Sequence, residues 1–402
     1  MNATPPQSLE ADRFDRLRRI PWWQQETLQQ AKVLVLGAGA LGNEILKNLA
    51  LLGVGNIFIA DLDDIEASNL SRSILFREKD RGRPKAEVAA EAVCDVYPDV
   101  TVGWLRGDVR FDLGLGVFRW ADVVIAGMDN REARLWINRC CWKTNTPWVD
   151  GATEVFQGVV RVFLPPEGPC YECTLSEIEF ELLKERQGCW GMRPSGMPDG
   201  VVSTTPVTSS VIAALQCQEA VKLLHRMDGL AGKGFVFNGV TNNSYVVSFS
   251  ANEDCTSHET FARVRSLDRS VAGTTLRELL GIARAELGPG AQVDFNQIVL
   301  FSLRCMACDK TELVLQPLAS VLEGRVRCPD CGKERLPEHS KWLDESCPFL
   351  DRTLAELGVP PFDIVAAHCG PNNEIAYEFA ADAPAVLGPL WRCAAEVGGG
   401  VR

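Results

Sequence analysis

The stretch Lys32–Gly42, with the sequence KVLVLGAGALG, decides the fold of this chain. An unbroken apolar run leads into the pattern Gly-x-Gly-x-x-Gly, and residues 43–52 then follow helical spacing, so we expect a buried strand that turns tightly into a helix. Such a turn is typical of nucleotide sites. Gly37 permits the turn, Gly39 lets backbone amides approach a phosphate, and Gly42 lets the helix lie close to the sheet.

Polar and charged residues gather where the next expected strand ends. Residues 56–60 form an apolar run that ends in Asp61, whose carboxylate is placed to hold a ribose hydroxyl. The segment 61–72 is rich in acidic and polar groups, and Arg83 and Lys85 follow it. Attack at the α-phosphate of a nucleotide needs such phosphate-binding groups because negative charge builds on oxygen atoms, whereas hydride transfer in a dehydrogenase does not. The alternative is a solvated charged loop.

Together these motifs resemble the adenylation domain of ubiquitin-activating enzymes and of the bacterial adenylyltransferases in the molybdopterin and thiamine pathways, the ThiF–MoeB superfamily. The resemblance covers residues 10–260. Besides the glycine turn, the residues that carry it are Asp61, Asp63, Asn69, Arg72, Lys85 and the pair Asp129-Asn130.

The resemblance implies a set of nucleotide contacts. ATP would lie on the glycine turn, Asp61 would hold the ribose with Asp63 beside it, and Asn69, Arg72 and Lys85 would engage phosphates. The family commonly has glutamine after this arginine. Here Ser73 stands at that position, so one expected polar contact lacks its residue.

Asp129 is the expected Mg²⁺ ligand. The apolar run 121–126 predicts a buried strand, and ligands of parallel sheets bind beyond the carboxyl ends of the strands. A carboxylate suits Mg²⁺, although Asp129 is also suited to cap the helix expected from Arg131; the match in residue type and order favours magnesium. In the resembling family an N-terminal arginine reaches the ATP phosphates, often in the partner subunit. Arg16 is the matching residue, and its alternative is a surface arginine.

Two loops predict a zinc site. Cys170 and Cys173 form a Cys-x-x-Cys pair, and far downstream Cys255 precedes His258, one of 4 histidines in the chain. Three thiolates and one imidazole make a closed tetrahedral site, which is structural rather than catalytic. The resembling family has a two-loop zinc site at these points, commonly with four cysteines. A single Cys-x-x-Cys pair is otherwise redox-active or coincidental.

Residues 176–205 are expected to form a loop that crosses over the nucleotide site. In the ubiquitin-activating members this loop carries a cysteine that receives the activated carboxylate as a thioester, and Cys189 stands in the matching place. Neighbouring cations at Lys184, Arg186 and Arg193 favour a thiolate, the form that attacks. The alternative is an ordinary loop cysteine.

The C-terminal part carries a second set of cysteines. Cys305, Cys308, Cys328 and Cys331 form two Cys-x-x-Cys pairs at the spacing of a zinc ribbon, residues 305–331. Two pairs satisfy one tetrahedral ion, which disfavours a redox role. Residues 353–379 read as a helical turn and two strands. This closing pattern is similar to the ubiquitin-fold domain with which some activating enzymes recruit a conjugating enzyme; the alternative is a stabilising or dimerising appendage.

Length and composition set limits on the class of protein. A chain of 402 residues is expected to hold two or three domains, here a disordered lead over residues 1–9, an adenylation domain over 10–260 and a C-terminal domain over 261–402. The net charge of −12 argues against nucleic acid or an anionic membrane as the main partner. With no membrane-length apolar run and no apolar signal core, a cytoplasmic protein is expected, in which the 15 cysteines serve as zinc ligands or thiols rather than disulfides.

The sequence therefore predicts an α/β protein: a Rossmann-like adenylation domain with a mostly parallel sheet, and a smaller α+β C-terminal domain with a zinc ribbon. The expected function is ATP- and Mg²⁺-dependent activation of a ubiquitin-like protein, with a thioester at Cys189 and transfer to a conjugating enzyme, in a homodimer. By analogy the single chain suggests a bacterial operon of the kind linked to phage defence. The alternatives are an adenylyltransferase for a sulfur-carrier protein, a nucleotide-dependent scaffold without turnover, and a dehydrogenase.

Overall fold

The structure is a computed structural model that describes residues 12–179, 203–321 and 323–391. Two sheets organise it, one in each half of the chain. The disordered lead expected over residues 1–9 lies outside the described residues, and so does Cys189. Within the described residues, no helix is both long and apolar enough to cross a membrane.

The first sheet has eight strands in the order β3-β2-β1-β4-β5-β6-β7-β8. The first five strands in this order are parallel, and β6, β7 and β8 continue the sheet antiparallel. The predicted mostly parallel sheet is therefore confirmed. The strands are β1 (Lys32–Leu36), β2 (Asn56–Asp61), β3 (Thr101–Arg106), β4 (Val123–Ala126), β5 (Trp148–Glu154), β6 (Gln157–Phe163), β7 (Lys233–Asn238) and β8 (Asn243–Ser248).

Helices cover both faces of this sheet, because alternate residues of each central strand are apolar and point to opposite faces. Val33 and Val35 pack on the face covered by α3 (Ala40–Leu52), α4 (Lys85–Val96) and α8 (Pro206–Leu224). Leu34 and Leu36 pack on the face covered by α5 (Leu115–Trp120) and α6 (Arg131–Thr144). Two short helices, α1 (Asp15–Arg18) and α2 (Gln25–Gln30), precede β1. The short 3₁₀ helices of this half are Ala67–Ser71, Glu78–Asp80 and Glu172–Thr174.

The second sheet has the order β11-β10-β13-β14-β9, and β12 also pairs with β10. β14 and β9 are parallel and the other pairs are antiparallel. Its strands and helices are β9 (Val264–Leu267), α9 (Leu276–Leu287), β10 (Gln292–Cys305), β11 (Thr311–Pro317), β12 (Arg335–Leu343), β13 (Ile364–His368), β14 (Glu374–Phe379) and α10 (Ala383–Leu387), with 3₁₀ turns at Leu318–Ser320, Glu323–Val326, Ala355–Leu357 and Ala380–Asp382. The helical turn and two strands expected in 353–379 are present.

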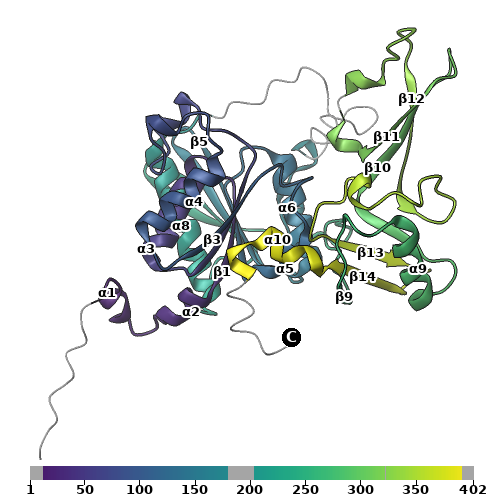
Figure 1. Ribbon diagram of the computed structural model, residues 1–402. Helices are drawn as coiled ribbons and strands as arrows, with labels where there is room; N and C mark the ends of the chain where they lie inside the picture. The colour runs from purple at the N-terminus through teal and green to yellow at the C-terminus, as the bar shows by residue number, and fades with distance from the viewer. Residues whose placement is uncertain (1–11, 180–202, 322, 392–402) are drawn as a thin grey trace, which may run out of the picture.

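The long strand β10 explains the shape of this half. Its first residues pair with β13 in the sheet, and its later residues pair with β11 and β12 in a ribbon that extends away from the rest of the molecule (Figure 1). The cysteines of the second set lie at the end of this ribbon. The expected ribbon is therefore an extension of the second sheet rather than a separate unit.

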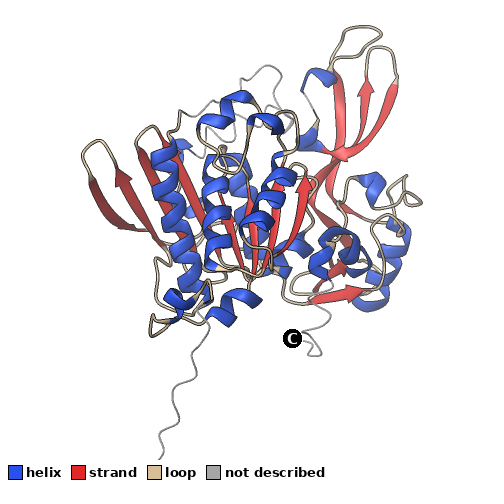
Figure 2. Ribbon diagram, turned by 60° about the vertical axis from the view of Figure 1, so that its left-hand side comes forward, coloured by secondary structure: helices blue, strands red, loops and turns tan. Residues whose placement is uncertain are grey.

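One of the hydrophobic clusters of the core contains residues from both halves of the chain. Leu387, the last residue of α10, and Leu390 pack beside Phe58 and Gly103 of the first sheet. The helix α10 lies on the face that α5 and α6 cover further along (Figures 1 and 2). A Cβ atom added at Gly103 would lie 2.9 Å from Leu390 Cδ1. The sequence boundary at residue 260 separates the sheets, but the C-terminal segment completes the core of the first half.

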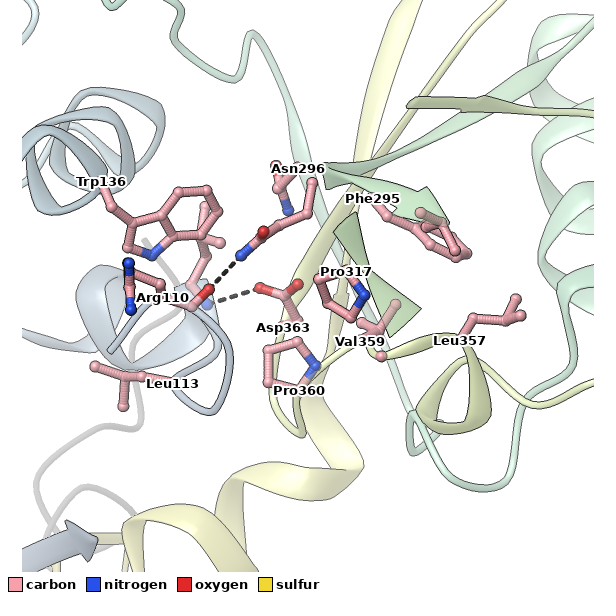
Figure 3. Close-up of a pocket in the computed structure, with 14 residues that line it drawn as sticks. Arg110, Leu113, Trp136, Phe295, Asn296, Pro317, Leu357, Val359, Pro360 and Asp363 are labelled. Atoms are coloured by element: carbon pink, nitrogen blue, oxygen red, sulfur yellow. Dashed lines mark hydrogen bonds between the residues drawn. The ribbon is translucent and has the colours of Figure 1, made fainter. Parts of the chain in front are cut away.

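Polar contacts also cross this junction. The Leu115 amide donates to Asp363 Oδ1 (2.8 Å), and Arg119 pairs with Glu378 (2.8 Å). Figure 3 shows a small cavity here, lined by Arg110 and Trp136 from the first half and by residues such as Asp363 from the second. Burial raises the pKa of Asp363 to about 6, although the hydrogen bond from Leu115 acts in the opposite direction.

Candidate active site

The glycine turn has the form that the sequence predicts. Gly37 follows β1 with φ +88°, and a Cβ atom there would lie 2.9 Å from the carbonyl oxygen of Gly127. A Cβ atom at Gly42 would lie 1.9 Å from Gly37 O, so the first turn of α3 can approach the loop only with glycine at this position. A Cβ atom at Gly39 would meet nothing within 4 Å. Gly39 is therefore not required for packing and faces open space.

Asp61 links the end of β2 to this turn. Its Oδ2 accepts a hydrogen bond from the Ala38 amide (2.6 Å), and its Oδ1 accepts one from the Asp63 amide (2.8 Å). Burial raises the pKa of Asp61, and the positive charge of Lys85 opposes that shift. The carboxylate thus lies beside the glycine turn, where the sequence places the ribose-binding group, and each oxygen keeps a lone pair for a hydroxyl donor.

Lys85, Asn69 and Arg72 surround the same edge of the sheet and make internal contacts. Lys85, the first residue of α4, is buried and pairs with Asp63 (Nζ to Oδ2, 2.7 Å). Asn69 Oδ1 accepts from the Glu66 amide (2.9 Å) and caps its own 3₁₀ turn. Arg72 Nη1 donates to Ser68 O (2.6 Å). Lys85 and Arg72 each have further N–H donors, and the Asn69 contact uses only its oxygen, so these side chains can engage phosphates while they keep these partners.

Sequence reasoning missed Asn43, which joins two loops of this site. Its Nδ2 donates to Ala38 O (2.7 Å) and Gly39 O (3.1 Å), and its Oδ1 accepts from the Leu75 amide (2.8 Å). The side chain is fully buried. The available signal was an amide residue directly after the last glycine of the turn, Gly42. Close by, Ser73 is buried and its Oγ has no hydrogen-bond partner among the described residues.

Asp129 lies after β4 and is exposed. Among the described residues its one hydrogen bond comes from Asn130 Nδ2 to its Oδ1 (3.1 Å). Its alternative role as the cap of α6 is wrong. The cap is Asn130, whose Oδ1 accepts from the Ala133 amide (2.8 Å), because the helix begins at Arg131 and the residue directly before it has the extended backbone of a cap. The Asp129 carboxylate is thus available, and one carboxylate together with substrate phosphates is a usual ligand set for Mg²⁺.

Arg16 lies far from the glycine turn of its own chain. It is exposed on α1, and α1 packs at the opposite end of α3, where Phe14 contacts Gly53. Arg13 donates to Val96 O at the end of α4 (2.7 Å). Since α3 has 13 residues, about 20 Å separates its two ends. Within one chain, Arg16 and the glycine turn are not brought together.

The first set of predicted zinc ligands comes together. Cys170 Sγ lies 3.5 Å from Cys255 Sγ, and Cys173 Sγ lies 3.4 Å from His258 Nε2, although the two loops are more than 80 residues apart. All four ligand atoms lie within 4.8 Å of one another. The His258 ring stacks on Trp142 of α6 (centroids 4.1 Å apart), and burial lowers its pKa, which favours the neutral imidazole that a metal requires.

The second set also converges, and it is built from two similar turns. Cys305 Sγ lies 3.5 Å from Cys331 Sγ, and Cys308 Sγ lies 3.7 Å from Cys328 Sγ. The Cys305 amide donates to Lys310 O and the Cys328 amide to Lys333 O, both at 2.8 Å. The four sulfur atoms lie within 4.8 Å of one another. A tetrahedral ion fits this donor set.

The other buried cysteines are packing residues, as expected. Cys217 on α8 and the adjacent Cys140 and Cys141 on α6 are almost fully buried, and burial raises the pKa of each thiol, that of Cys217 to about 12. These thiols are therefore unreactive near neutral pH.

Comparison with known proteins agrees with this geometry. The family model described as ThiF family matches residues 13–257, which is more than half of the chain. This chain belongs to the ThiF family. The resemblance predicted from the sequence is thus confirmed.

The relatives of this ThiF-family chain are activating enzymes of the E1 type. The chain is 32% identical over 259 residues to the SAMP-activating enzyme E1 of Haloferax volcanii, covering 62% of this chain and 90% of that protein. It is 45% identical over 157 residues to the NEDD8-activating enzyme E1 catalytic subunit of Dictyostelium discoideum, covering 36% of this chain and 35% of that protein. The chain thus spans about a third of the latter relative.

Solved structures show the same fold. The structure of E. coli MccB with ATP has a TM-score of 0.52 and 23% sequence identity, and the match covers 63% of this chain and 75% of that chain.

Proposed function

We propose that this ThiF-family chain activates a ubiquitin-like protein by adenylating its C-terminal carboxylate with ATP. The observation that carries the proposal is the approach of Gly37 to the Gly127 carbonyl. This approach puts the glycine turn next to residues 127–130, the loop between β4 and α6 that carries Asp129 and is called the Asp129 loop below. Asp61, Lys85 and Arg72 are at the same edge of the sheet. The match to the SAMP-activating enzyme E1 over 90% of that protein supports a ubiquitin-like substrate.

The residues have separate roles in this reaction. Amides at the start of α3 face the phosphates, and Asp61 accepts hydrogen bonds from the ribose hydroxyls. Lys85 and Arg72 donate to the phosphates, with Asn69 beside them. Asp129 would hold Mg²⁺, which neutralises charge on the phosphates when bound. A carboxylate oxygen of the carrier bonds to the α-phosphorus while the bond to the β-phosphate oxygen breaks, so the products are acyl-adenylate and pyrophosphate.

The proposal continues with transfer to Cys189. The thiolate attacks the acyl-adenylate, AMP leaves, and a thioester forms that a conjugating enzyme then accepts. Division of the transfer into two steps is what covalent catalysis achieves. In a homodimer, a second copy of the chain would supply Arg16, which is consistent with its distance from the glycine turn of its own chain. The two ligand sets would each hold one structural Zn²⁺, and the ubiquitin-fold-like C-terminal part would recruit the conjugating enzyme.

An adenylyltransferase for a sulfur-carrier protein is the second candidate, since the same adenylation site would serve it without Cys189. One experiment distinguishes the two. The protein is mixed with Mg²⁺, ATP and a small ubiquitin-like protein as the candidate carrier, and intact masses are measured without reductant for the wild type and for Cys189→Ala.

A thiol-sensitive adduct of one carrier mass, formed by the wild type and by the control Cys94→Ala but absent from Cys189→Ala, supports the activating enzyme. Cys94 is an exposed cysteine on α4 and serves as the matched control. Carrier–AMP formed equally by all three proteins, without any enzyme adduct, contradicts the thioester and leaves the sulfur-carrier reaction.

A further inference from the structure

A buried group of three charges lies directly behind the Asp129 loop. Asp150 on β5 is fully buried and bridges two arginines: Arg134 of α6 (Nε to Oδ1, 3.1 Å) and Arg161 of β6 (Nη1 to Oδ2, 2.9 Å). Asp150 and Arg161 are direct partners on the antiparallel strands β5 and β6. Burial of charge is costly unless the geometry is good, so this cluster needs an explanation beyond stability.

Arg134 reaches from this cluster to the loop. Its Nη2 donates to the carbonyl oxygen of Met128, the residue before Asp129, and to Gly151 O (3.2 Å). Arginine side chains on helices extend toward the helix N-terminus, which takes this guanidinium back under the loop. The Arg134 side chain is itself largely buried, with 11% exposed. One planar group therefore ties the residues after β4 to the middle of β5.

The loop is held from only a few other points. The Gly127 amide donates to Leu36 O (2.9 Å), which fixes the start of the loop to β1. Asn130 fixes its end by capping α6. Asp129 lies between these points, and within the described part of the chain its side chain has one hydrogen bond, the contact with Asn130. The backbone just before Asp129 thus depends on Arg134.

We propose that Arg134 is a positioning residue that fixes the Asp129 carboxylate for Mg²⁺, with Asp150 holding the guanidinium in place. This rests on the proposed function, because Asp129 acts there as the metal ligand. Arg134 itself is not proposed to touch the nucleotide. Its effect is expected to be restricted to binding that depends on the metal, since the glycine turn and Asp61 bind ATP without Asp129.

The test measures binding by calorimetry rather than activity. ATP is titrated into the full-length protein in excess Mg²⁺ and, separately, in EDTA. The variants are Arg134→Lys, which keeps the charge beside Asp150 but loses the planar fork, and the double variant Arg134→Gln/Asp150→Asn, which removes the charge pair. The control is Arg139→Ala on the same helix, whose guanidinium contacts Glu172 instead (3.4 Å).

Loss of a residue that orients a metal ligand costs about 10- to 100-fold in metal affinity. We therefore expect Kd for ATP in Mg²⁺ to rise at least about tenfold in both variants. Kd in EDTA should match the wild type, and the control should match it in both conditions.

Equal weakening with and without Mg²⁺, or no change in either condition, overturns the positioning role. A wild type whose ATP affinity is the same in Mg²⁺ and EDTA refutes the metal role of Asp129. A wild type that binds no ATP refutes the proposed function itself.

Discussion

Gly42→Ala tests the role of the glycine turn most sharply, because the structure provides a matched control in the same motif. The new Cβ atom would lie 1.9 Å from Gly37 O and 2.7 Å from Gly37 C. Both are backbone atoms, and Cβ contacts below 3.0 Å essentially do not occur, so α3 would have to move by about 1 Å. At Gly39 the added Cβ atom meets nothing within 4 Å, and φ is −74°.

The expected cost follows from these contacts. Overpacking costs about 1–3 kcal/mol, and the higher helix propensity of alanine returns about 1 kcal/mol at most. With the full return, the net loss is up to about 2 kcal/mol, which lowers Tm by up to roughly 8 °C for a domain of this size. The shift also moves the amides that face the phosphates, and a displacement of about 1 Å can reduce the rate about 100-fold.

The assay compares both variants with the wild type by thermal unfolding and by ATP binding. Gly42→Ala should lose both stability and ATP affinity. Gly39→Ala should unfold at the wild-type temperature but bind ATP weakly, because its methyl group occupies the space left for a phosphate. The reasoning is refuted if Gly42→Ala behaves as wild type, or if Gly39→Ala loses as much stability as Gly42→Ala.

Three further predictions concern stability and metal content. Leu390→Ala removes a buried contact with the first sheet and should lower the free energy of unfolding, measured in urea, by about 2–5 kcal/mol. The control Trp391→Ala, at a residue 38% exposed, should lower it by under about 1 kcal/mol, and equal losses would contradict the shared core. Cys255→Ser and Cys305→Ser should each lower the zinc content by one ion per chain, measured by elemental mass spectrometry, and an unchanged content in either would remove that site. The pKa of Asp363 is raised from 3.8 to about 6, so its contribution to stability is present below pH 4 and is lost as pH rises to about 6. Over this range the free energy of unfolding of the wild type should fall by about 3 kcal/mol relative to that of Asp363→Asn, and parallel stability–pH profiles of the two proteins would contradict the prediction.

Local patterns explain what the sequence predicted well. The strand before Gly37 and the helix after Gly42 follow from an apolar run, a glycine turn and helical spacing, all within 21 residues. The pairing of Cys255 and His258 with the distant Cys170 loop followed from ligand chemistry, which needs four donors around one ion, together with the resemblance to a family that has a two-loop zinc site at these points. Such signals do not depend on knowing the rest of the fold.

Other features depend on contacts that no local pattern contains. The helix begins at the expected residue, Arg131, so the cap is Asn130, which directly precedes it, and not Asp129. The packing of Leu390 over Phe58 joins segments more than 300 residues apart. The bond from Arg134 to Met128 O depends on the side-chain direction on α6 and on the buried charge of Asp150. These residues look ordinary in the sequence.

The central claim is that the edge of the first sheet near Asp61 and Asp129 adenylates a carboxylate. The most direct measurement is the intact mass of a candidate ubiquitin-like carrier after incubation with this protein, Mg²⁺ and ATP, in parallel with the same carrier without its last residue. The account predicts that the full-length carrier gains one AMP and that pyrophosphate is released, while the shortened carrier does not react. Hydrolysis of ATP to ADP, with the carrier mass unchanged, would contradict it.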